Sequence, residues 1–77
     1  MSPEMTRVES SLISEVGYDE EARTLHVQFK KGGPGVYVYE DVPSEVYHDL
    51  IYSESLGRFF LKEIKGVYSG KKIEEKP

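Results

Sequence analysis

The sequence contains no cysteine and no long apolar segment. Without cysteine the chain can form neither disulfide bonds nor thiolate metal sites, as is typical of proteins in a reducing compartment. No apolar run approaches the roughly 20 residues that a membrane helix needs, and residues 1–10 lack the apolar core of a signal peptide. We therefore expect a cytoplasmic protein that does not act at a membrane.

Positive charge is also scarce in most of the chain. The net charge of the 77 residues is -4. Residues 1–56 carry four basic and eleven acidic side chains, whereas residues 57–77 carry six basic and three acidic ones. The overall field of such a protein opposes nucleic acid at long range, but its C-terminal part can attract an anion locally.

Three segments have the pattern of β-strands, at residues 12–19, 24–30 and 36–40. The second alternates most clearly, with Leu25, Val27 and Phe29 on one face and polar side chains on the other. Strict alternation is typical of a strand that is buried on one face. The turn-forming residues at 20–23 and 31–35 separate the strands and predict an antiparallel meander.

The apolar period changes from two to 3.6 after Pro43. Ser44 is the expected N-cap of a first helix that buries Leu50. Residues 53–55 end this helix and precede a second one. The second helix is expected to share one apolar face among Leu56, Phe60, Ile64, Val67 and Tyr68. The sequence predicts an α+β fold, a three-stranded antiparallel meander followed by two helices packed on one face.

This βββαα arrangement is expected to form one domain over residues 8–70. Residues 1–7 and 71–77 lack apolar periodicity and are predicted to be flexible tails. The core is expected to contain apolar and aromatic residues of strands two and three and of both helices. These residues are Leu25, Val27, Phe29, Tyr37, Tyr39, Leu50, Phe60 and Ile64.

Several short motifs together resemble the KTSC domain, a module named for the C-terminus of some bacterial lysyl-tRNA synthetases. They are "SS" at 10–11, "GYD" at 17–19, "LHVQF" at 25–29, "YVY" at 37–39, "VP" at 42–43, "SLGRFF" at 55–60 and "IKGVY" at 64–68. The resemblance covers roughly residues 8–68, and its synthetase context suggests RNA binding. It implies no catalytic residues.

Tyr37 and Tyr39 have one residue between them on the third strand, so both rings point to the same side of the sheet. One interpretation is an aromatic platform that stacks bases, as in some RNA-binding folds. The interpretation that we favour is a core wall, because a tyrosine ring is apolar and its hydroxyl can reach the wet edge of a thin sheet–helix interface.

A basic stripe is expected on the outer face of the second helix. Arg58, Lys62 and Lys65 recur there at helical spacing, and Phe59 lies at the edge of the stripe. Lys71 and Lys72 extend it. Long cationic side chains on one accessible face can contact phosphates. The alternative is an ordinary solvated helix face.

The sequence offers no pattern for catalysis or metal binding. His26 and His48 are the only histidines, and no further ligands are placed to converge on them. Glu40 and Asp41 are adjacent, so on a strand they point to opposite faces and cannot act as a pair. We expect no enzyme activity, no cofactor, no metal and no small-molecule substrate.

The sequence leaves two binding functions open. The first is a module that binds RNA through Arg58, Phe59, Lys62, Lys65, Lys71 and Lys72. The second is a protein-interaction module that uses the exposed sheet face around His26, Gln28, Val36 and Val38, or the sheet edge. The basic C-terminal part favours the first, and the acidic total favours the second.

Overall fold

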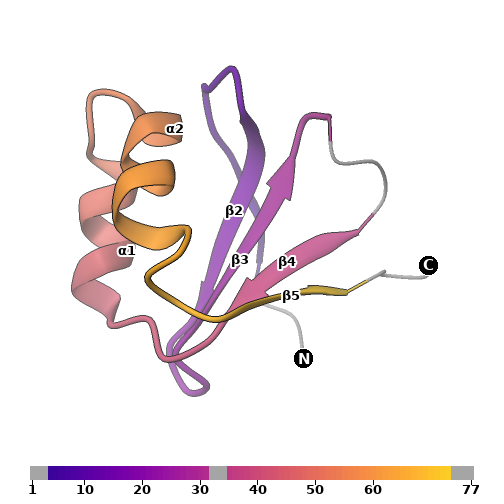
Figure 1. Cartoon of the computed structure of the whole chain (residues 1–77), viewed down its shortest axis with the longest axis vertical. Coiled ribbons are helices and arrows are strands. Elements are labelled where there is room, and N and C mark those ends of the chain that lie inside the picture. Colours follow the sequence, from indigo (N-terminus) through magenta and orange to yellow (C-terminus); the bar gives the residue numbers. More distant parts are fainter. Residues whose placement is uncertain (1–3, 32–34, 74–77) are drawn as a thin grey trace.

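The fold is a single antiparallel sheet with one layer of helices on one face, as seen in a computed structural model (Figure 1). The structure describes residues 4–31 and 35–73. The strands are β1 (Thr6–Arg7), β2 (Ile13–Asp19), β3 (Thr24–Phe29), β4 (Val36–Tyr39) and β5 (Gly70–Ile73). The helical segments are α1 (Ser44–Ile51), α2 (Leu56–Phe59) and the π-helical segment η1 (Phe60–Ile64).

The five strands follow one another in the sheet in chain order, and all neighbours are antiparallel. The predicted α+β class and the meander of three strands are therefore confirmed, but the strand count is wrong. Residues 6–7 pair with β2 and residues 70–73 pair with β4, and all of them except Gly70 belong to the segments expected to be flexible tails. The predicted turn at 31–35 lies partly outside the described residues.

A bulge in β2 brings two apolar residues of that strand to the same face. Ile13 pairs with Phe29 and Glu15 pairs with Gln28, so Ser14 is an extra residue on β2. Residues three apart on a regular strand point to opposite faces, and one inserted residue corrects this. Ile13 and Val16 are consequently both fully buried.

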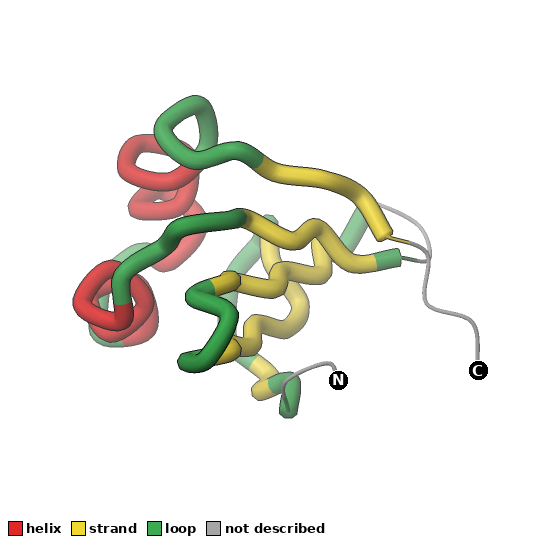
Figure 2. The backbone as a smooth tube through the Cα atoms, turned by 90° about the horizontal axis from the view of Figure 1, so that it is seen from below, coloured by secondary structure: helices red, strands yellow, loops and turns green. Residues whose placement is uncertain are grey.

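The core lies between the sheet and the helices (Figure 2). Of the eight predicted core residues, Leu25, Val27, Leu50, Phe60 and Ile64 are at most 1% exposed, and Tyr39 is 7% exposed. Phe29 and Tyr37 are half-buried and pack against this core. The core prediction is therefore confirmed, with Phe29 and Tyr37 at its margin.

The start of the first helix lies one residue earlier than predicted. Pro43 is the N-cap of α1, and its carbonyl accepts a hydrogen bond from the Val46 amide at 3.0 Å. Ser44 is the first helical residue and its side chain makes no capping hydrogen bond. Proline has a fixed φ and no amide hydrogen, and both properties suit a position where a helix begins.

The second helix is shorter than predicted and changes type. It is α-helical only over Leu56–Phe59, then widens into η1, where the Lys65 amide donates to the Phe60 carbonyl at 2.9 Å. Gly66 has a φ of 84°, a left-handed conformation that ends helices and suits glycine. Val67 is therefore 62% exposed instead of buried, whereas Tyr68 still packs against the core.

Candidate functional site

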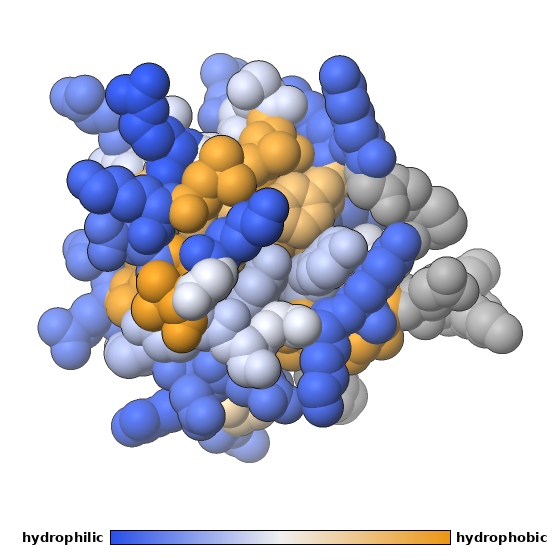
Figure 3. All heavy atoms as spheres, in the orientation of Figure 1, coloured by the Kyte–Doolittle hydropathy of each residue, from blue (hydrophilic) through white to orange (hydrophobic). Residues whose placement is uncertain are grey.

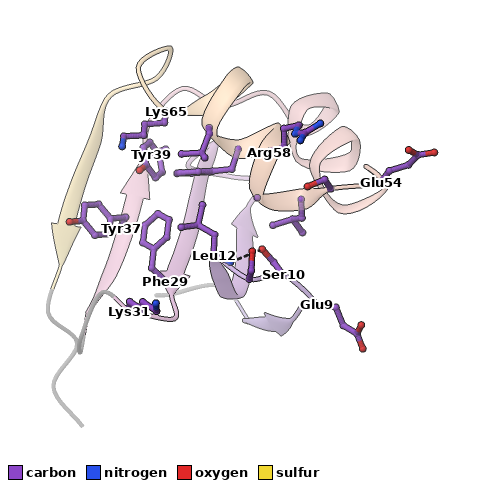
Figure 4. Close-up of a pocket in the computed structure, with 16 residues that line it drawn as sticks. Glu9, Ser10, Leu12, Phe29, Lys31, Tyr37, Tyr39, Glu54, Arg58 and Lys65 are labelled. Carbon is purple, nitrogen blue, oxygen red and sulfur yellow. Dashed lines mark hydrogen bonds between the residues drawn. The ribbon is translucent and has the colours of Figure 1, made fainter.

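An open hollow of about 880 Å³ lies where α2 and η1 meet the sheet (Figure 4). Phe29, Tyr37 and Tyr39 form its wall on the sheet side. Leu56, Phe60 and Leu61 form its wall on the helical side. Leu61 is 51% exposed, and apolar side chains are visible between helices and sheet in Figure 3, bordered by hydrophilic ones.

The wall on the sheet side is a cluster of aromatic rings that contact one another. The centroids of Tyr37 and Tyr39 lie 6.5 Å apart with 22° between the ring planes. Phe29 meets Tyr37 edge-on at 5.2 Å, and Phe60 meets Tyr39 edge-on at 5.4 Å. Such arrangements stabilise aromatic pairs beyond the area that they bury. The four rings therefore pack against one another as one cluster.

The register settles which way the tyrosines point. Tyr39 pairs with Leu25 and Tyr37 pairs with Val27, so both rings lie on the face that the helices cover. The core interpretation is confirmed for Tyr39, and burial raises the pKa of its hydroxyl, with a further rise from the neighbouring Tyr37. Both rings also line the hollow. The pair is therefore part of the core wall and also of the surface of the hollow.

Gly70 allows the Tyr39 ring to occupy this position. The two residues are opposite each other in β4 and β5. A Cβ atom at Gly70 would lie 2.4 to 2.9 Å from three ring atoms of Tyr39. The ring thus lies over the bare backbone of β5, an arrangement in which an aromatic side chain covers a glycine across two strands.

The far end of the hollow is polar and comes from two loops. The Ser10 Oγ accepts hydrogen bonds from the amides of Leu12 and Ile13, at 3.1 and 3.2 Å. A Cβ atom at Gly57 would lie 3.2 Å from this oxygen and 3.3 Å from the Leu12 Cβ, so α2 packs closely on the segment before β2. Glu9 and Glu54 lie at this end, away from the tyrosines (Figure 4).

Three cationic residues line the hollow, namely Lys31, Arg58 and Lys65. Lys65 lies beside Tyr39 and Lys31 beside Phe29 (Figure 4). All three side chains are exposed. Cations next to aromatic rings are the combination that binds an anionic group attached to a planar ring.

The structure separates the residues of the predicted basic stripe. Arg58 and Lys65 line the hollow, but Lys62 is exposed outside it. Phe59 is half-buried and packs against the core, not at the edge of an open stripe. The π-helical segment η1 ends at Ile64 and Lys65 has an extended backbone, so Lys65 does not continue the helical spacing of Arg58 and Lys62.

The two lysines of β5 lie on opposite faces of the sheet. Lys72 pairs with Tyr37 and shares its face, whereas Lys71 pairs with Val38 on the other face. Sequence reasoning missed Lys31, Glu9, Ser10 and Glu54 as residues that line the same hollow as the rings. Their only sequence signal is the "SS" motif at 10–11, since the fold alone brings these segments together.

The sheet face predicted for protein binding is only partly accessible. His26, Gln28 and Val38 are half-buried, and Val36 is buried at 8% exposure, so its assignment to an exposed face is wrong.

Within residues 4–31 and 35–73, no three His, Asp or Glu residues form a group that could hold a metal. No helix in this part of the chain is long and apolar enough to span a bilayer.

The fold and the hollow define a small α+β domain with helices on one face of a five-stranded sheet. The sequence profile of the KTSC domain matches residues 9–68, and the chain belongs to this family. The crystal structure of a KTSC domain protein from Yersinia pestis superposes with a TM-score of 0.88 at 36% identity. The match covers 94% of this chain and 99% of that one.

Two further relatives place the domain in different contexts. An uncharacterised protein of Stutzerimonas stutzeri is 41% identical over 58 residues, which are 75% of this chain and 79% of the relative. A lysine–tRNA ligase of Nostoc punctiforme is 36% identical over 64 residues, 83% of this chain but 11% of the ligase. The domain thus occurs in a small protein and as a minor part of a large one.

Proposed function

We propose that this chain is a non-catalytic binding module that takes single-stranded RNA at the hollow. The observation that carries the proposal is a wall of three aromatic rings with Lys31 and Lys65 on either side of it, in a hollow that Arg58 also lines. Proteins that bind single strands combine cationic side chains for the phosphates with aromatic rings on which bases stack.

The similarity to a segment of a lysine–tRNA ligase supports RNA as the nucleic acid. The net charge of -4 requires that binding depends on local contacts, since the overall field repels the polyanion. We therefore expect a weak interaction that tolerates sequence changes and falls steeply with salt.

Titration of an unstructured RNA oligonucleotide into labelled protein, at low and moderate salt, tests the proposal. Three phosphate contacts imply a log–log salt slope of about -2, at roughly -0.7 per contact on a single strand. Lys65→Gln should reduce the magnitude of this slope by about 0.7 and leave the fold intact, because the side chain is exposed. Absence of binding at low salt would refute the proposal.

A protein-interaction module is the second candidate. Both helices lie on one face of the sheet, so within residues 4–31 and 35–73 no helix covers the opposite face with His26, Gln28 and Val38 (Figure 2). Ile73 lies opposite Val36 in the sheet and is 48% exposed. If RNA does not bind, affinity capture of partner proteins by the wild type and by Val38→Asp tests whether this face is used. A partner that binds this face should be captured less by the variant.

A further inference from the structure

The hollow is chemically polarised along its length. Lys31 and Lys65 lie on opposite sides of the aromatic wall, whereas Glu9, Glu54 and Ser10 lie away from the rings, and Arg58 lies between Tyr39 and Glu54 (Figure 4). Carboxylates repel a phosphate but accept hydrogen bonds from hydroxyl and N–H groups. An anionic group is therefore favoured beside the rings, next to Lys31 or Lys65 and away from both glutamates.

The walls of the hollow differ as well. The sheet side presents ring surfaces, and Tyr37 is half-buried, so part of its ring remains accessible. The helical side presents Leu61, which is 51% exposed. A planar ring can lie between an aromatic and an aliphatic surface, as flipped or unpaired bases do in proteins that read them.

A base in a duplex cannot reach this surface, because its neighbours stack on both of its faces and its partner occupies its pairing edge. The exposed cations Lys31 and Lys65 could still touch the backbone of a duplex from outside. Discrimination between paired and unpaired strands must therefore come from the rings and not from the charges.

We propose that the hollow binds one unpaired nucleotide, with its base on Tyr37 and its phosphate beside Lys65. The ribose hydroxyls then point toward the end with Ser10, Glu9 and Glu54. This inference rests on the proposed function and refines it, since it makes the recognised unit a single nucleotide instead of a length of backbone.

Three small probes divide the nucleotide into its parts: adenosine 5′-monophosphate, adenosine and ribose 5-phosphate. Amide chemical shifts should move around the hollow with the monophosphate. Adenosine lacks the anion and ribose 5-phosphate lacks the ring, so each should bind at least about five-fold more weakly. Equal binding of ribose 5-phosphate and the monophosphate would overturn the inference.

Paired variants locate the contacts. Tyr37→Leu keeps an apolar side chain but removes the ring, and should weaken the monophosphate about five-fold or more. Tyr52→Leu is its control, since Tyr52 is 83% exposed and does not line the hollow. Lys65→Gln should also weaken binding, whereas Lys62→Gln, exposed outside the hollow, should not. The lysine pair keeps the test valid if Tyr37→Leu fails to fold.

An oligonucleotide, alone and annealed to its complement, separates this inference from the proposed function. Preference for the single strand, lost in Tyr37→Leu, supports both. Equal binding of strand and duplex with Tyr37→Leu unchanged overturns the single-nucleotide inference and leaves RNA binding in place. Monophosphate binding in the hollow without any oligonucleotide binding refutes the proposed function and retains the nucleotide site.

Discussion

The pair Tyr18 and Tyr47 and the pair Tyr37 and Tyr39 both bring rings together nearly face to face, but in different surroundings. Tyr18 on β2 stacks on Tyr47 of α1 at 5.2 Å with 15° between the planes, and its hydroxyl donates to the Val42 carbonyl. Tyr37 and Tyr39 are on one strand and line a hollow with cations.

The difference shows how the context of a tyrosine decides its role. A stack between two elements, with its hydroxyl bonded to a third segment, ties the fold together. A pair on one strand joins no elements by itself, and its contacts to Phe29 and Phe60 leave ring surface toward the hollow. Four changes can break or sharpen this comparison.

Phe60→Ala should have the largest effect. Phe60 is 1% exposed and its ring contacts both Phe29 and Tyr39, so truncation leaves a cavity behind the tyrosine wall. Removal of a buried phenylalanine ring costs about 3–5 kcal/mol, which would nearly unfold a domain of this size. Urea denaturation measures the loss. A free energy of unfolding equal to that of the wild type would contradict the core assignment.

Gly70→Ala should come next. The new methyl group would collide with the Tyr39 ring, and overpacking of this kind costs about 1–3 kcal/mol. Hydrogen exchange at β5 should accelerate, because either the ring or the strand must move. Lys71→Ala is the matched control on the neighbouring residue, whose side chain points to the other face. Similar exchange rates in both variants would argue against the ring–backbone contact.

Tyr18→Phe should have a smaller effect that is confined to the other pair. It removes the hydrogen bond to the Val42 carbonyl but keeps the stack on Tyr47, and a typical hydrogen bond contributes about 0.5–1.5 kcal/mol. Thermal unfolding compares it with Tyr37→Phe, which keeps the ring contacts of the hollow. If Tyr37→Phe destabilised the fold more than Tyr18→Phe, the roles assigned to the pairs would be reversed.

The pH dependence of stability should give the smallest effect. Burial raises the pKa of Tyr39 above its usual value of 10.0, and it raises the pKa of Tyr47 in the same way. A raised folded-state pKa stabilises the fold below the unfolded pKa, near 10, and this contribution is lost as pH rises through the folded pKa. Unfolding free energies above pH 10 should decline less in Tyr39→Phe than in the wild type. Identical profiles would exclude this contribution.

The parts of the fold that follow local patterns could be predicted from the sequence. Alternation located β3, and the change of period after Pro43 located α1. The edge strands β1 and β5 have no such pattern, because all their residues are exposed and only pairing with β2 and β4 orders them. The π-helical segment could not be predicted either, since its residues fit an α-helical period.

The residues of the candidate site could be predicted only in part, for the same reason. Tyr37, Tyr39, Arg58 and Lys65 could be selected by residue type and spacing. Lys31 lines the same hollow only because of how the sheet and the helices pack, and no local pattern records that. The burial of Val36 is likewise a property of the assembled sheet, not of its neighbours in sequence.

The composition of β5 also affects how the molecules behave at high concentration. β5 is the last strand of the sheet order, and a strand in that position can template the addition of a strand from another copy. Its sequence, Gly-Lys-Lys-Ile, places charged ammonium groups on both faces of that edge. Two copies that approached edge to edge would bring these charges together, so the strand that completes the sheet also discourages its growth into fibrils.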